Sequence, residues 1–152
     1  MAKRLLENYF SELSLGQFEL TPRRTVTETD VVQWSMFTGD WFPMHSDAIF
    51  AAESMFGQRI AAGLMILAMS GGLVVPATTR SIIANYGNER IRYPSPTFIG
   101  DTIQVRVTIT KLEPRDADSG IMDMEWDVMN QNGTVVCNAI FKALLAMKEP
   151  QE

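Results

Sequence analysis

The sequence predicts an α+β fold, in which one very apolar helix packs against an antiparallel sheet. Two observations predict it. The first half of the 152 residues carries helical spacing and helix-capping residues, whereas the second half alternates apolar and polar residues in long runs. Between them, residues 60–76 are apolar nearly all round, as a buried helix is. Such a helix is a natural cover for the apolar face of the sheet.

The N-terminal part is expected to hold a short helix and an extended segment. Apolar residues repeat at helical spacing over 5–12, which indicates a short helix. Residues 18–26 favour an extended segment that is interrupted at Pro22, because proline cannot donate to a strand ladder.

Two further helices are expected before the apolar one. Thr27 and Asp30 offer capping oxygens for a helix over 30–38, and Gly39 is a natural C-terminal stop. The other predicted helix covers 48–54. Ser46 or Asp47 is expected to cap it. The side chains of Ile49, Phe50 and Met55 are expected to point inward.

The rest of the chain is expected to form strands. Residues 102–110 alternate cleanly, with apolar side chains on one face and polar ones on the other. Proline and glycine separate the apolar runs, and Asn132-Gly133 is typical of a tight hairpin turn. The expected strands cover residues 83–93, 102–110, 120–129 and 134–147. Their spacing favours an antiparallel meander.

The composition bounds the class of protein. With 46% hydrophobic residues, the chain is long enough for one core and short for two, so we expect a single domain over 1–152. The net charge is −5 and the 13 Lys and Arg residues are scattered, which argues against nucleic acid as a partner. Cys137 lies in a strand-like run and is expected to be a buried small hydrophobe. The N-terminus shows no apolar signal core and residues 60–77 are too short for a confident membrane span, so we expect a cytoplasmic protein without a membrane partner.

Residues 39–47, which read GDWFPMHSD, are the most informative stretch for function. They hold the only histidine, His45, which follows Asp40 by five positions with Pro43 between the two. A carboxylate and an imidazole on one short, stiff loop can share a water molecule and carry out acid–base chemistry near neutral pH. The alternative is that Asp40 is a cap and His45 an ordinary loop histidine. Asp47 is a third candidate, although an N-cap explains it better.

Two other positions could contribute to a site. Gly63 lies at the front of the apolar helix, where free backbone N–H groups and the helix dipole favour a negatively charged oxygen. The alternative is that the glycine serves only to allow tight packing at this position. The run RIRY at 90–93 is typical of a solvated strand face, or its arginines could meet phosphates.

Several familiar templates are absent from the sequence. It contains no GxGxxG, no GxxxxGK[ST] and no GxSxG. One histidine and one cysteine are too few ligands for a His/Cys zinc site, so no metal is expected.

Three ordered motifs resemble the MaoC-like dehydratase family, which includes the (R)-specific enoyl-CoA hydratases. They are GDWFPMHSD at 39–47, FGQRIAAG at 56–63 and PTFIGD at 96–101, and the resemblance runs from about residue 24 to 147. It implies the hot-dog fold, an antiparallel sheet wrapped around one long apolar central helix. It also implies that Asp40 and His45 are the catalytic dyad and that the backbone N–H of Gly63 contacts the thioester oxygen.

The chain departs from the family pattern at two positions. The family's asparagine two residues after the aspartate is Phe42 here, and its histidine before the helix glycine is Ala62. Phe42 should make the pocket more apolar or narrower. The resemblance places four residues in the substrate pocket: Phe42, Pro43, Ala62 and Ser70.

The implied reaction is the reversible hydration of a trans-2-enoyl-CoA to an (R)-3-hydroxyacyl-CoA, a step of fatty acid metabolism. The CoA thioester is a substrate and no cofactor is needed. The exposed edge of such a sheet suggests a homodimer or a higher homo-oligomer. One alternative is a non-catalytic subunit that binds acyl thioesters. A thioesterase is less favoured, because residues 60–75 contain no Asp or Glu.

Overall fold

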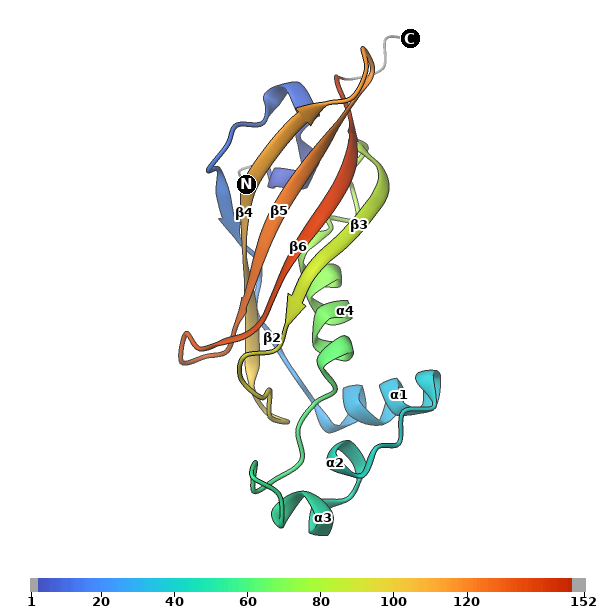
Figure 1. Cartoon of the computed structure of the whole chain (residues 1–152), viewed down its shortest axis with the longest axis vertical. Coiled ribbons are helices and arrows are strands. Elements are labelled where there is room, and N and C mark those ends of the chain that lie inside the picture. The colour runs from blue at the N-terminus through green and yellow to red at the C-terminus, as the bar shows by residue number, and fades with distance from the viewer. Residues whose placement is uncertain (1–2, 149–152) are drawn as a thin grey trace.

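A computed structural model describes residues 3–148, and its centre is an antiparallel sheet (Figure 1). The strands are β1 (Phe18–Leu20), β2 (Arg24–Thr25), β3 (Ile82–Arg92), β4 (Thr102–Pro114), β5 (Ser119–Met129) and β6 (Val135–Ala146). Their order is β1-β4-β5-β6-β3, and β2 also pairs with β4. The four long strands confirm the expected ones within a few residues at each end.

The expected meander is right for β4, β5 and β6 and wrong for β3. β3 pairs with β6 rather than with β4, its successor in the chain, and so forms an edge of the sheet. The connection from β3 to β4 contains Pro94 and Pro96, and it pairs with residue 60 through an isolated bridge at Phe98. It therefore crosses the end of the sheet instead of closing a hairpin.

Helix α4 (Gly63–Val74) lies along the concave face of the sheet, and the long strands curve around it (Figure 1). Its buried Met65, Ile66 and Val74 join one hydrophobic core with inward side chains of the sheet, such as Val105 and Trp126. The alternation predicted for 102–110 is confirmed by the complete or nearly complete burial of Ile103, Val105, Val107 and Ile109. The expected arrangement, a sheet wrapped around one apolar helix, is confirmed.

The apolar helix begins three residues later than expected. Residues 60–62 are extended, because Ile60 forms the bridge to Phe98 and the Ala61 N–H donates to the Thr97 carbonyl oxygen at 2.8 Å. Gly63 is therefore the first residue of the helix. Its position in the first turn leaves its backbone N–H without an intrahelical acceptor.

The N-terminal helical segment differs from the expected single helix. Residues 5–12 form two short 3-10 helices, η1 (Leu5–Glu7) and η2 (Phe10–Glu12), and not one continuous helix. In each, an N3 glutamate accepts from the N-cap backbone N–H, which favours separate single turns.

Helices α1 (Glu28–Thr38), α2 (Pro43–Ser46) and α3 (Ala48–Ala52) extend from one end of the sheet (Figure 1). Thr27 caps α1 through a capping box with Asp30, and Gly39 ends it with a φ of 77°, as expected. The expected inward orientation on the 48–54 helix is wrong, because Ile49 is 78% exposed and Met55 92% exposed. These helices lie beyond the sheet, so the sheet cannot cover their apolar side chains.

Within residues 3–148, no helix is both long enough and apolar enough to cross a membrane.

Candidate active site

His45 lies on α2, a single helical turn and not the loop that the sequence suggested. Pro43 is the first residue of this turn, where its fixed φ and missing N–H are well tolerated. Asp40 lies in the link from α1, just after the cap at Gly39, and accepts at Oδ1 from the Phe42 N–H at 3.3 Å. The end of α1 and the start of α2 therefore set the distance between the two side chains.

The two ring nitrogens of His45 face different oxygens. Nδ1 lies 2.8 Å from the Ile60 carbonyl oxygen, and Nε2 lies 4.0 Å from Asp40 Oδ2. A carbonyl oxygen only accepts, so Nδ1 is the nitrogen that carries the proton. In the neutral ring, Nε2 is then an acceptor that faces a second acceptor, the carboxylate.

A separation of 4.0 Å is too long for a direct hydrogen bond, but it suits one water molecule that donates to both groups. The environments of the pair differ, since the His45 side chain is 13% exposed and that of Asp40 is 42% exposed. The structure thus brings together the two predicted acid–base residues in the geometry that a shared water requires.

A cavity of about 270 Å³ adjoins the ring of His45. Gly63 lines it at the first turn of α4, where no side chain caps the helix. The remaining lining residues are Phe56, Ile60, Ala61, Ile66, Tyr93, Pro94, Ser95, Pro96, Thr97 and Val136. The histidine and the start of the apolar helix therefore share one mostly apolar pocket.

Gly63 is also required by packing. A β-carbon placed on it would lie 2.9 Å from the ring of Tyr93, closer than side chains normally approach. The tight-packing explanation of this glycine is therefore confirmed, while its N–H group remains free of a side-chain cap.

Phe42 lies beside the dyad. Its ring is edge-on to the His45 ring, with centroids 5.8 Å apart, and it also contacts Phe50 edge-on at 6.3 Å. Phe42 and Pro43 are both exposed, and neither is among the residues that line the cavity. An apolar group thus covers one side of the imidazole, where the resemblance places an asparagine in relatives.

The other two predicted pocket residues lie in the core. Ala62 is buried at the N-cap of α4 and is not among the residues that line the cavity. Ser70 is fully buried, and its hydroxyl donates to the Ile66 carbonyl oxygen at 2.7 Å. This placement does not support a role for Ser70 in the pocket beside His45.

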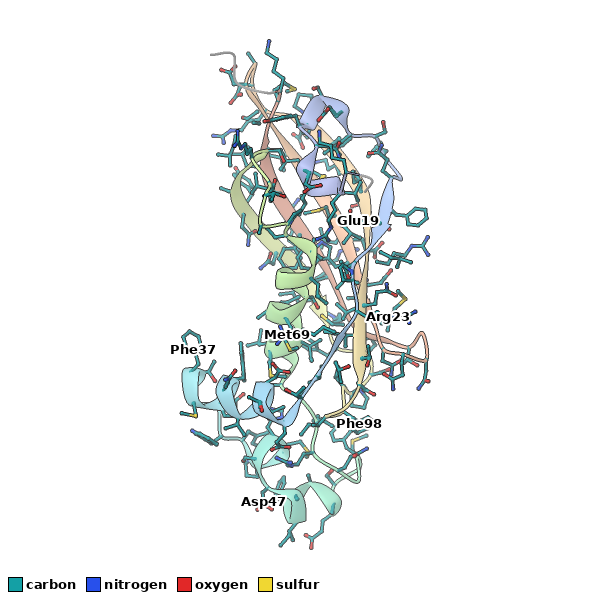
Figure 2. All side chains as sticks on the ribbon, turned by 180° about the vertical axis from the view of Figure 1, so that it is seen from behind. Glu19, Arg23, Phe37, Asp47, Met69 and Phe98 are labelled. Atoms are coloured by element: carbon teal, nitrogen blue, oxygen red, sulfur yellow. The ribbon has the colours of Figure 1, made fainter. Side chains whose placement is uncertain are left out.

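Asp47 has the capping role that the sequence favoured. Its Oδ1 accepts from the backbone N–H groups of Ile49 and Phe50 at 2.9 and 3.1 Å. Figure 2 shows Asp47 at the helical end of the molecule, to which the β3–β4 connection also brings Phe98, while Phe37 projects from the far tip of α1.

Two contributors were not predicted from the sequence: the Ile60 carbonyl oxygen, which orients His45, and the Tyr93 ring, which covers Gly63. Burial raises the pKa of the Tyr93 hydroxyl. In the RIRY run at 90–93, the arginines were the predicted candidates for contact with phosphates, but Tyr93 is the residue that lines the pocket. Arg92 Nη1 instead donates to the neighbouring Ile91 carbonyl oxygen.

Neither a reactive cysteine nor a group of metal ligands is found among the described residues. Cys137 is fully buried, as expected, and burial raises the pKa of its thiol to about 11, so it stays protonated at neutral pH. No three His, Cys, Asp or Glu side chains within residues 3–148 are grouped so that they could hold a metal ion.

Comparison with known proteins agrees with the motifs. The chain is 49% identical over 100 residues to Protein MaoC of Klebsiella aerogenes, a match that covers 66% of this chain and 30% of that protein. It is 32% identical over 106 residues to a 3-hydroxybutyryl-CoA dehydratase of Methylorubrum extorquens, covering 70% of this chain and 66% of that protein. The chain therefore spans about a third of the first relative and just under two thirds of the second.

The fold is also found among solved structures. A conserved hypothetical protein from Mycobacterium tuberculosis with a double hot-dog fold superposes with a TM-score of 0.83 at 18% identity, covering 99% of this chain and 47% of that one. This likeness shows the fold, which is the hot-dog. A family model described as a MaoC like domain matches residues 13–128, more than half of the chain, and so this chain belongs to the MaoC-like dehydratase family.

Proposed function

We propose that this protein reversibly hydrates a trans-2-enoyl-CoA to an (R)-3-hydroxyacyl-CoA. The observation that carries the proposal is the pair of acceptors, His45 Nε2 and Asp40 Oδ2, held 4.0 Å apart while Nδ1 is fixed by the Ile60 carbonyl oxygen. The name of the Methylorubrum relative, a 3-hydroxybutyryl-CoA dehydratase, supports chemistry of this class.

The pair would act on a shared water. The thioester carbonyl makes Cβ of the enoyl group electrophilic, and the water oxygen bonds to Cβ as one member of the pair removes its proton. The π electrons move toward the carbonyl and build negative charge on its oxygen. The pair then returns a proton to Cα, so the net change is addition of one water.

Gly63 would stabilise the charge that develops. Its N–H lies at the N-terminus of α4, where the free N–H groups and the helix dipole favour an anionic oxygen. The pocket that Gly63 shares with His45 is mostly apolar, which strengthens such an interaction by excluding water. CoA acts here as part of the substrate, and the mechanism needs no further cofactor or metal.

The protein is proposed to act as a homodimer. Strand β3 is an edge of the sheet, with unpaired backbone groups along its outer side. Exposed apolar side chains lie on β3, at Ile83 and Tyr86, and on α4 and its C-cap, at Leu64 and Val75. A second copy paired along β3 would cover the edge and the apolar side chains of this strand. A cytoplasmic location and a place in fatty acid metabolism are part of the same proposal.

The test is the loss of absorbance of the enoyl-thioester band on adding the protein to a panel of trans-2-enoyl-CoAs. We expect catalytic loss of the band with at least one acyl chain, at a rate that falls by about two to four orders of magnitude in Asp40→Asn or His45→Gln at equal concentration. Tight binding of acyl-CoA without turnover would instead identify a non-catalytic thioester-binding subunit. Release of free CoA without hydration would identify a thioesterase.

A further inference from the structure

The Arg59 side chain joins two parts of the chain that carry the dyad. Its guanidinium donates to Glu28 through two nitrogens, Nη1 to Oε1 at 2.8 Å and Nη2 to Oε2 at 2.6 Å. Nη1 also lies 3.5 Å from the His45 carbonyl oxygen. Two parallel bonds between planar groups fix their orientation as well as their distance.

Each residue of this ion pair is connected through the backbone to a group that positions one member of the dyad. Glu28 is the first residue of α1, and Asp40 follows the same helix two residues after its last. Arg59 immediately precedes Ile60, whose carbonyl oxygen accepts from His45 Nδ1. The ion pair therefore connects the helix that carries the carboxylate to the carbonyl group that holds the imidazole.

Helix α1 has few other attachments to the body of the protein. Only Val31 and Ser35 of its residues are buried. Hydrogen bonding to Arg59 lowers the pKa of the Glu28 carboxyl, and the carboxylate raises the pKa of Arg59, so both groups are charged at neutral pH. A charged, doubly hydrogen-bonded contact at the start of α1 is thus well suited to fix where the helix lies.

We infer that Arg59 and Glu28 are positioning residues, which set the separation of Asp40 and His45 and hold the Ile60 carbonyl oxygen against Nδ1. Neither touches the reacting atoms. Their effect on rate rests on the proposed function, whereas their effect on the imidazole ring does not. The two effects can therefore be measured separately.

The kinetic test compares Arg59→Gln, Glu28→Gln and the double variant. Displacement of an acid–base group by about 1 Å costs on the order of 100-fold, so each single change should lower kcat by about 10- to 100-fold with little change in KM. Because the two residues act as one unit, the double variant should be no slower than the worse single. Arg59→Lys, which keeps the charge but loses the paired geometry, should fall between wild type and Arg59→Gln.

A matched control lies on the same turn of α1. Arg24 Nη2 donates to Asp30 Oδ1 at 2.6 Å, an ion pair that touches neither His45 nor Ile60. Arg24→Gln should keep kcat within about twofold of wild type, the size of effect expected for a surface ion pair remote from the site. An equal loss in Arg24→Gln and Arg59→Gln would show general weakening of α1 and would overturn the inference.

The structural test uses the only histidine in the chain, so that a ¹⁵N spectrum of imidazole nitrogens contains a single ring. Wild type should show the proton on Nδ1, and Arg59→Gln should shift the population toward the Nε2 tautomer while Arg24→Gln does not. An unchanged ring in folded Arg59→Gln, or a double variant whose loss equals the product of the two single losses, would overturn the inference. If wild type lacks hydratase activity, the proposed function fails, and this spectrum still decides the role of Arg59.

Discussion

The tautomer of His45 is set by a backbone atom and not by a side chain. The Ile60 carbonyl oxygen fixes the proton on Nδ1, so that Nε2 can accept from a water shared with Asp40. In the other tautomer, Nε2 would carry the proton, so it could not accept a hydrogen bond from the water. The chemistry at this site therefore depends on how residues 44–45 and 60 are held together, which the 3.3 Å bond from the Ile60 N–H to the Met44 carbonyl oxygen also supports.

Asp40→Asn and His45→Gln should each lower turnover by about two to four orders of magnitude, the usual contribution of a positioned acid or base. Folding should be retained, because neither side chain belongs to the hydrophobic core. Steady-state rates on the best enoyl-CoA, with circular dichroism for folding, measure both effects. Asp47→Asn is the control, since asparagine also caps helices well and this carboxylate caps α3. Near-wild-type turnover in either dyad variant would remove these residues from the mechanism.

Phe42→Asn should widen the range of acyl groups that the protein accepts. The ring of Phe42 lies against His45, so a polar acyl end near it would lose water without gaining a partner. Rates on polar acyl chains should rise relative to those on simple alkyl chains, which should change little. Competition between one alkyl and one polar enoyl-CoA measures this ratio directly. A uniform loss on all substrates would mean that Phe42 supports the dyad and does not select the acyl chain.

At the residue scale, the sequence predicted the groups that carry motifs and missed those that act through distant contacts. Asp40 and His45 could be paired because they are five positions apart, with the stiff Pro43 between them. The Ile60 carbonyl oxygen could not be found, since any residue supplies a carbonyl and only the fold places one against Nδ1. Tyr93 approaches Gly63 from another element, and no local pattern reports that contact.

At the scale of elements, the first residue of α4 must leave room for the Tyr93 ring. In the proposed mechanism, the N–H of the same residue, Gly63, also contacts the thioester oxygen, and no side chain caps the helix there. The nearly all-round apolar composition predicted a buried helix here but placed its start at residue 60, because that composition continues through the extended residues before the helix. The bridge between Ile60 and Phe98, which holds this segment extended, is a long-range contact that no local pattern reports.

Gly63→Ala should destabilise the fold by about 1–3 kcal/mol, since the added methyl overpacks against Tyr93. Gly72→Ala is the matched control on the same helix, where a β-carbon meets nothing within 4 Å. It should stabilise the protein by about 0.5–1 kcal/mol through helix propensity. Urea unfolding of the two variants and wild type gives both values, and equal stabilities for the two variants would contradict the contact with Tyr93.

The short helices show where local pattern is insufficient. Capping predicted α1 and α3 because Thr27, Gly39 and Asp47 act within a few residues of their own backbone. Ile49 on α3 and Met55 just after it were expected to point inward, yet both side chains are largely exposed. The sequence could not indicate that α1–α3 lie beyond the end of the sheet (Figure 1).

At the scale of the whole molecule, the α+β class follows from the strand pattern and the apolar helix, whereas the wrapping of the sheet around that helix was implied by the family resemblance. The edge position of β3 does not follow from the strand pattern, because strand order depends on how the 93–101 connection crosses the sheet. The single domain over 1–152 stays a prediction, which a single cooperative unfolding transition of the full chain would support.

Assembly is a property of the same scale. The exposed edge at β3 and the apolar side chains beside it should be covered by a second copy, so sedimentation equilibrium should give at least a dimer at micromolar concentration. Tyr86→Lys, which places a charge on the exposed face of β3, should weaken association. A stable monomer of the wild-type chain at micromolar concentration would contradict the proposed homodimer.

The central claim is that one water, held between Asp40 and His45, adds to a single face of an enoyl thioester. Chiral analysis of the product formed from crotonyl-CoA tests it most directly, because a water fixed between two side chains is delivered from one side only. The account predicts the (R)-3-hydroxy product alone, formed at a rate that collapses in His45→Gln. An (S) product, a racemic product, or hydration that survives His45→Gln would contradict it.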